Sequence, residues 1–197
     1  LGALLIGVAA IGTVGSVAES MRDGINDNAR ILLGGDLEIS SLHTPPSDEV
    51  IDAAAALGKV SQVIQMRAML QAGDKRKLVE LKAVDNHWPL IGRAGVDPAM
   101  PLATVLDGNG MAADGALLRS LGLKPGDSAR LGDMDIEVRA NLTDEPDRSI
   151  SFVSFGPRVL ISKNTLAATG LQQPGSFITY RYRLLLKDPE TRKTALA

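Results

Sequence analysis

The sequence has no cysteine, only 3% aromatic residues and almost no excess of either charge, with a net charge of −2. The lack of cysteine excludes disulfides and thiolate metal sites. The scarcity of aromatic side chains leaves few platforms on which bases or sugars could stack. Because no basic surplus is present, there is also no electrostatic case for binding nucleic acid. The distribution of apolar residues is more informative than these absences.

The N-terminal stretch carries no charged residue from Leu1 to Ala18. As a helix this run would measure about 27 Å, close to the thickness of a membrane's hydrocarbon core. No proline occurs before Pro45, and the first pair of adjacent glycines is Gly34-Gly35, so the helix is expected to continue past the apolar part. The pattern predicts a transmembrane helix and stalk over residues 1–35. Two alternatives are a signal-peptide core, although no basic segment precedes it, and a buried helix of a soluble protein.

The stalk part of this helix carries a narrow apolar stripe at helical spacing, made of Val17, Met21, Ile25 and Leu32. Such a stripe is typical of a helix that packs on one partner helix or on its own domain. We therefore interpret the stalk as a rod that transmits motion rather than as a simple tether.

The first half of the remaining chain predicts the order strand, helix, strand, strand. A short strand is expected at 36–40, and a helix at 48–57 that Ser47 caps and Gly58 ends. The expected buried face of this helix is Val50, Ile51, Ala54 and Leu57. Alternating residues then predict a long hairpin of strands at 60–72 and 77–84, with a turn at Gly73-Asp74-Lys75.

The second half is richer in strands. Its periodicity predicts a helix at 112–121 and a short one at 164–168, with strands at 128–131, 136–142, 150–155, 158–162 and 176–187. Asp188 and Pro189 have the chemistry of a new helix start. The order predicts an α+β fold: a ferredoxin-like module over 36–103 and 171–197, interrupted by a β-rich insert over 104–170 and truncated at its end.

Residues that could carry chemistry are few. A hydrolase hypothesis would rest on His87 alone, because the other histidine, His43, lies beside prolines and no G-x-S-x-G motif is present. Two acidic groups, Asp133/Asp135/Glu137 and Asp144/Glu145/Asp147, do not match a calcium loop, and no phosphate-binding loop occurs. The sequence therefore predicts no catalytic residue, no cofactor and no metal site.

One apolar loop patch has two interpretations. Trp88, Leu90 and Ile91, which flank Pro89, form either a contact for a partner or lipid, or the cap of one end of the sheet. The second interpretation is the simpler one, because a lone tryptophan commonly finds the edge of a core.

Several of these segments together resemble a known family. The stretches LLGGDLEIS, LKAVDNHWPLIG, LLRSLGLKPGDSARLG and ATGLQQPGS are similar to the first extracytoplasmic domain, with its preceding membrane helix, of FtsX-like or MacB-like ABC transporter permeases, in particular the YbbP-like group. The resemblance extends over essentially the whole chain.

The resemblance implies a non-catalytic permease subunit of the bacterial inner membrane, with the part after residue 35 on the periplasmic side. Its implied partners are a cytoplasmic ABC ATPase, the remaining membrane helices of the permease, the lipid membrane and a periplasmic lysophospholipase or esterase. Its implied role is to transmit ATP-driven motion to a lipid-like, lipoprotein or hydrophobic substrate. The alternative is a membrane-anchored or secreted binding module without a transport role.

Overall fold

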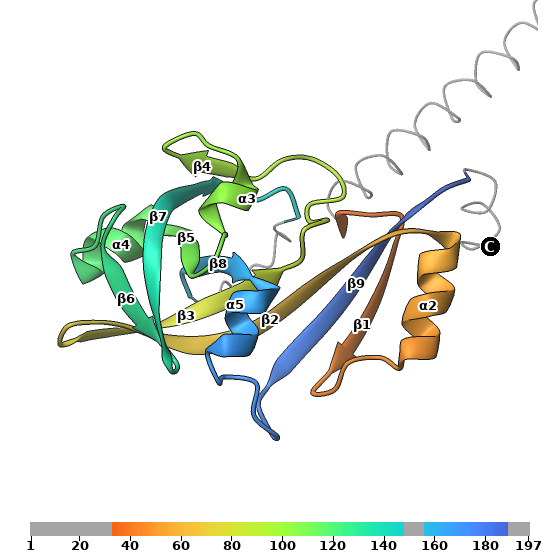
Figure 1. The fold of residues 1–197 in the computed structure, drawn as a ribbon, viewed down its shortest axis with the longest axis horizontal. Coiled ribbons are helices and arrows are strands. Elements are labelled where there is room, and N and C mark those ends of the chain that lie inside the picture. Colours follow the sequence, from red (N-terminus) through yellow and green to blue (C-terminus); the bar gives the residue numbers. More distant parts are fainter. Residues whose placement is uncertain (1–32, 148–155, 189–197) are drawn as a thin grey trace, which may run out of the picture.

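A computed structural model describes residues 33–147 and 156–188, and a mixed sheet of nine strands runs through this part (Figure 1). The elements are β1 (Leu37–Leu42), α2 (Asp48–Leu57), β2 (Gly58–Ala72), β3 (Lys75–Val84), β4 (Gly95–Asp97), α3 (Leu102–Val105), β5 (Gly110–Asp114), α4 (Gly115–Leu121), β6 (Ser128–Leu131), β7 (Met134–Asp144), β8 (Arg158–Ser162), α5 (Lys163–Ala168) and β9 (Ile178–Leu186). The mixed α and β content agrees with the predicted class.

The strand order is β1-β9-β2-β3-β8-β5-β7-β4, and β6 pairs with both β2 and β7. Strand β9 is antiparallel to β1 on one side and to β2 on the other, so β1 and β2 run parallel with β9 between them. Helix α2 connects β1 to β2, which makes a split β-α-β arrangement. Strand β9, the last strand in sequence, therefore lies between β1 and β2, the first two.

The hairpin of β2 and β3 confirms the strongest prediction from residue alternation. Its strands pair in register from Val63 opposite Val84 to Ala72 opposite Lys75, and the turn contains Gly73 with φ of 56°. Each strand also pairs along its other edge, β2 with β9 and β6, and β3 in parallel with β8. The hairpin is thus shared by the two halves of the sheet.

Apolar residues form clusters on both faces of the sheet. The larger cluster includes Ile64 of β2, Leu81 of β3 and Ile161 of β8, and it is covered in part by α4 and α5. A smaller cluster contains Val63 and Leu160, the neighbours of Ile64 and Ile161 along the same strands. Since successive strand residues point to opposite faces, the two clusters lie on opposite sides of the sheet.

The helix predicted at 112–121 is wrong in its first part, because residues 110–114 form β5 and α4 begins only at Gly115. Ala112 and Ala113 are fully buried, and β5 lies between β7 and β8. Sheet pairing outweighs the helical preference of alanine at this position. The side chain of Asp114 accepts a hydrogen bond from the Ala116 amide at 2.7 Å and so sets the start of the helix.

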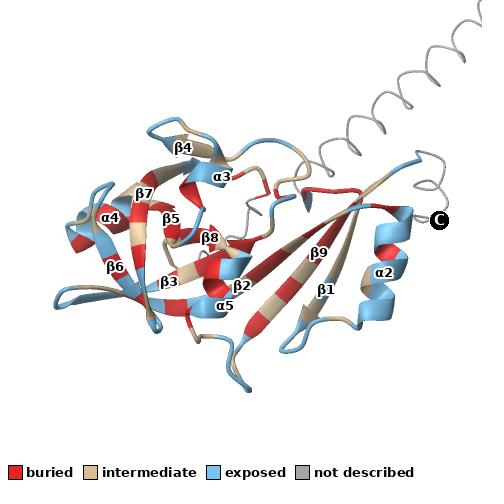
Figure 2. Cartoon of the chain, viewed as in Figure 1, coloured by how far each residue is buried: buried red, intermediate tan, exposed pale blue. Residues whose placement is uncertain are grey.

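Helix α2 has the predicted bounds, but its predicted buried face is largely wrong. Of the four residues only Ala54 is buried, while Val50 is 42% exposed and Leu57 48% exposed (Figure 2). Gly58 ends the helix as predicted, and with an extended φ of −175° it also starts β2. A Cβ at Gly58 would meet the carbonyl oxygen of Leu185, so this glycine permits close pairing with β9.

Several predictions lie outside the described residues: the membrane helix, the stalk stripe of Val17, Met21, Ile25 and Leu32, the strand at 150–155 and the helix from Pro189. Within 33–147 and 156–188, no helix has the combined length and apolarity needed to cross a membrane.

Candidate functional site: a buried chain of charges

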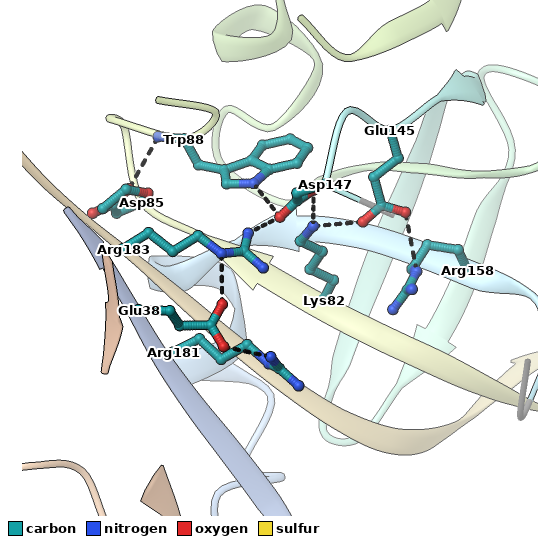
Figure 3. Close-up of polar contacts among 10 residues, drawn as sticks. Glu38, Lys82, Asp85, Trp88, Glu145, Asp147, Arg158, Arg181 and Arg183 are labelled. Atoms are coloured by element: carbon teal, nitrogen blue, oxygen red, sulfur yellow. Dashed lines mark hydrogen bonds and ion pairs between the residues drawn. The ribbon is translucent and has the colours of Figure 1, made fainter. Parts of the chain in front are cut away.

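Charged side chains extend across the face of the sheet opposite α2. Ion pairs link eight of them in alternating sign, and we call this set the charge chain; Figure 3 labels all of its members except Glu80. In order along it the members are Arg181, Glu38, Arg183, Asp147, Lys82, Glu145, Arg158 and Glu80. They come from β1, β3, β8 and β9 and from the loop Glu145–Asp147 that follows β7, which we call the β7 loop.

Lys82 lies at the centre of the charge chain, near the C-terminal end of β3. Its Nζ is 2.5 Å from Oε1 of Glu145 and 2.6 Å from Oδ1 of Asp147, and its side chain is 1% exposed. The same nitrogen lies 4.4 Å from the ring centre of Trp88, a cation–π contact. One buried amine therefore binds both carboxylates of the β7 loop.

Asp147 has the most varied contacts. Besides Lys82, it forms an ion pair with Arg183 of β9 and accepts a hydrogen bond from Nε1 of Trp88 at 3.1 Å. Arg183 in turn donates to Glu38 of β1 at 2.9 Å, and Glu38 also pairs with Arg181 at 2.6 Å. Asp147 therefore connects the β7 loop to β9 and, through Arg183 and Glu38, to β1 at the other end of the sheet.

Glu145 extends the charge chain in the other direction. It pairs with Arg158 at the start of β8 at 3.2 Å, and Arg158 pairs with Glu80 of β3 at the same distance. The carboxylate of Glu145 is 2% exposed, whereas that of Glu80 is 25% exposed. The charge chain therefore opens toward solvent at this end.

The electrostatic environment of Lys82 is dominated by its burial. Desolvation lowers the pKa of Lys82 to about 7, the nearby Glu145 opposes this shift, and Arg183 and Arg158 add to it. Charges removed from water to this extent need well-placed partners, because an uncompensated buried charge is far more costly than a paired one. The alternation of signs gives each inner member two neighbours of opposite charge.

The segment Leu33–Asp36, which we call the lead-in segment, rests directly on the charge chain. Gly34 has φ of 70°, in the left-handed region that glycine adopts without strain. A Cβ at Gly34 would lie 3.1 Å from Cβ of Asp147 and 3.4 Å from Nη1 of Arg183. The amide of Asp36 donates to the carbonyl of Leu184 at 2.7 Å, so β9 also binds this segment.

The apolar loop patch predicted from sequence is divided by the structure. Trp88 is 6% exposed and belongs to the smaller apolar cluster, which agrees with its interpretation as a cap on the sheet. Leu90 and Ile91 are half-buried. Contact of these residues with a partner or lipid stays a prediction, and the enclosed Trp88 ring is instead a neighbour of the charge chain.

Asp85 and His87 form a turn rather than a catalytic pair. The carboxylate of Asp85 accepts hydrogen bonds from Oγ of Ser61, from the Gln62 amide and from the amides of its own turn. The ring Nδ1 of His87 lies 2.9 Å from the carbonyl oxygen of Val60. An open polar cavity of about 310 Å³ lies beside this turn, lined by Val84, Asp85, Asn86, His87, Ser162, Lys163 and Asn164.

Sequence reasoning treated Glu145 and Asp147 as part of an acidic loop and missed the charge chain. The signal in the sequence was a charged residue within an otherwise apolar strand, as for Lys82 in LKAV and Arg183 in YRYRLLL. The alternation of residues along a strand shows which face of the sheet such a residue points to. It does not show whether another part of the chain covers that face.

With this architecture, the described chain has the fold of the extracytoplasmic domains of MacB-like transporters. The periplasmic region of MacB from Actinobacillus actinomycetemcomitans matches with a TM-score of 0.53 at 11% identity, over 88% of this chain and 86% of that chain. The extracellular domain of the noncanonic ABC-type transporter YknZ from Gram-positive bacteria matches with a TM-score of 0.53 at 10% identity, over 80% and 88%. At these identities the likeness concerns the fold.

The sequence itself is similar to a particular permease. It is 29% identical over 181 residues to the uncharacterized ABC transporter permease YbbP of Escherichia coli (strain K12), covering 92% of this chain and 22% of the length of that protein. No protein-family model matches the chain. Fold and sequence together confirm the predicted resemblance to the extracytoplasmic domain of an FtsX-like or MacB-like permease.

Proposed function

We propose that the chain is the extracytoplasmic part of an ABC permease subunit and transmits ATP-driven motion that exports or extracts a lipid-like, lipoprotein or hydrophobic substrate. The observation that carries this proposal is the similarity to the permease YbbP over 92% of the chain. The fold shared with MacB and YknZ supports it. The domain itself is non-catalytic in this proposal, and ATP is hydrolysed on a separate cytoplasmic subunit.

The proposed organisation follows the predicted boundaries. A membrane helix and stalk occupy 1–35, a ferredoxin-like module occupies 36–103 and 171–197, and a β-rich insert occupies 104–170. The split β-α-β arrangement of β1, α2 and β2 around β9 supports the ferredoxin-like assignment, since such units build that fold. The segment after Asp188 would begin the second helix of the module.

The proposed location is the bacterial inner membrane, with the part after residue 35 in the periplasm. The proposed partners are the ATPase, the other membrane helices of the permease, the surrounding lipid and a periplasmic lysophospholipase or esterase. The chain spans 22% of the length of its permease relative, so the proposed location and partners are those of a larger protein and its complex.

The absence of cysteine provides a direct test of this location. Asp74 lies in the exposed turn of the β2–β3 hairpin, so Asp74→Cys adds a single accessible thiol to the chain. In the membrane-inserted permease, made free of other cysteines, a membrane-impermeant maleimide should label this thiol from the periplasmic side before the cells are broken. Labelling only after lysis would contradict the proposed location.

The alternative, an anchored or secreted binding module, predicts the same labelling but no ATPase partner. Purification of the full-length protein with its cytoplasmic ATPase separates the two functions. A stable complex whose ATP hydrolysis changes when the domain is deleted supports transport. A protein that purifies alone, with no change in hydrolysis, supports the binding module.

A further inference from the structure

Ionic contacts link the β7 loop to three strands of the sheet, β3, β8 and β9. Its two carboxylates, both almost fully buried, point toward the same amine of Lys82 and continue to Arg183 and Arg158. Pro146, between the two acids, lies next to Gly92, where an added Cβ would be 2.7 Å from Cβ of Pro146. Ion pairs have well-defined geometry, so they fix a loop in one position more strictly than apolar contacts do.

Asp147 contacts two regions that are distant from it in sequence: β3 with the loop after it, and β9. Its side chain touches β3 through Lys82, β9 through Arg183 and the loop after β3 through Trp88. Its Cβ is also the nearest neighbour of the position that a Gly34 side chain would occupy, at 3.1 Å. Asp147 follows β7, which pairs with β4, β5 and β6.

Burial of so many charges is not explained by stability alone. Replacing a buried ionic network by apolar residues of similar volume is often neutral or stabilising, so such networks are weak contributors to the free energy of folding. They do define a unique geometry, because each member must meet a partner of opposite charge. A set of charges placed where the lead-in segment meets the β7 loop is suited to positioning one relative to the other.

We propose that Asp147 is a coupling residue: it links the lead-in segment at Gly34 to strand β7, so that a displacement of the lead-in segment moves the insert. Displacement of Gly34 pushes on Asp147, the ion pairs to Lys82 and Arg183 shift with it, and the β7 loop carries the movement into the β4–β7 part of the sheet. The purpose of this coupling rests on the proposed function, but the coupling can be tested on the isolated chain.

Gly34→Ala is the direct test, because an added methyl would lie 3.1 Å from Cβ of Asp147, which must then shift by a few tenths of an ångström. Gly73→Ala is the matched control: Gly73 also has positive φ, at 56°, but a Cβ there has nothing within 4 Å. Both variants introduce similar backbone strain, and only Gly34→Ala touches the charge chain. Trp88, the single tryptophan of the chain, reports on Asp147 through its fluorescence.

In the full chain, Gly34→Ala should shift the Trp88 emission and lower hydrogen-exchange protection about tenfold at residues 141–144, where β7 pairs with β4. Gly73→Ala should change neither. An unchanged protein with Gly34→Ala, or equal changes in the two variants, would overturn the coupling.

A second variant tests the role of Asp147 itself. In an Asp147→Gly background, which removes the side chain that Gly34→Ala would displace, Gly34→Ala should have no further effect on Trp88 or on residues 141–144. An effect that persists in this background overturns the proposal. If Asp147→Gly does not fold, the comparison of Gly34→Ala with Gly73→Ala still decides. A failed labelling experiment at position 74 would leave this result unchanged, so the two proposals fail separately.

Discussion

The two faces of the sheet are filled by opposite chemistry. On the face that α2 covers, a large apolar cluster extends from Tyr182 of β9 to Ile136 of β7. On the other face, the charge chain lies beside the smaller apolar cluster around Trp88. Burial of apolar surface releases free energy roughly in proportion to its area, whereas burial of charge has a desolvation cost that ion pairs only offset.

The larger apolar cluster stabilises the fold, whereas the charge chain sets its internal geometry. Apolar contacts are non-directional, so the larger cluster favours compactness without requiring one exact position of a loop. The charge chain requires a partner at each step, and it therefore determines where the β7 loop and the lead-in segment lie. Variants on each face can test this division.

The largest effect is expected for Asp147→Asn, which leaves Lys82 and Arg183 without one of their buried partners. Loss of one member of a buried ionic network lowers the free energy of unfolding by about 3–5 kcal/mol. Urea unfolding measures this change. The matched control is Asp135→Asn in the exposed pair with Arg130, where a loss of less than about 1 kcal/mol is expected. Equal losses in the two variants would contradict a special role of burial.

On the apolar face, Leu131→Ala should lower the free energy of unfolding by about 3 kcal/mol. Leu131 is fully buried in β6, opposite Leu70 of β2, and its truncation would leave a cavity between the halves of the sheet. Leu42→Ala is the control, because Leu42 is 66% exposed and should change stability little. Thermal or urea unfolding of both variants compares them, and a similar loss in both would argue against the assigned core.

The lowered pKa of Lys82 predicts how stability depends on pH. The pKa is about 7 in the folded chain and 10.5 ordinarily, so between these values the unfolded chain binds a proton that the folded chain has released. The contribution of Lys82 to stability therefore rises with pH across this window and is lost as pH falls through 7, by at most ~1.4 kcal/mol per pH unit.

Urea unfolding of the wild type and Lys82→Met, at several pH values in this window, isolates the contribution. Lys77→Met on the same strand is the control, since Lys77 is exposed. A difference between wild type and Lys82→Met that does not change with pH would show that Lys82 keeps its ordinary pKa.

The smallest effect is expected at the more exposed end of the charge chain. The side chain of Arg181 is 33% exposed and that of Arg183 only 5%, although both bind Glu38. Solvent screening should limit the loss in Arg181→Met to about 1 kcal/mol or less. Arg183→Met should cost several times more, because Asp147 then loses a buried partner. The ratio of the two losses in urea unfolding measures how steeply burial strengthens the charge chain.

Local signals in the sequence were sufficient for many elements. The hairpin of β2 and β3, the bounds of α2 and the end of α4 at Gly122, whose φ is 76°, agree with the predictions. Each depends on residue alternation or on turn and cap chemistry within a few positions. The predicted resemblance also came from short stretches of sequence, and the comparisons confirm it.

Long-range pairing decided the rest. Ala112 and Ala113 became a strand because β7 and β8 lie on either side of them. In α2, Ala54 is buried and Ile51 packs on the larger apolar cluster, whereas Val50 and Leu57 stayed exposed. Lys82 and Asp147, 65 positions apart, met only when the sheet placed the β7 loop over β3. The elements and the apolar rows could be predicted from local sequence, since they depend on neighbouring residues. Which rows are covered and which charges pair depends on the folded sheet, because burial is a property of two surfaces in contact.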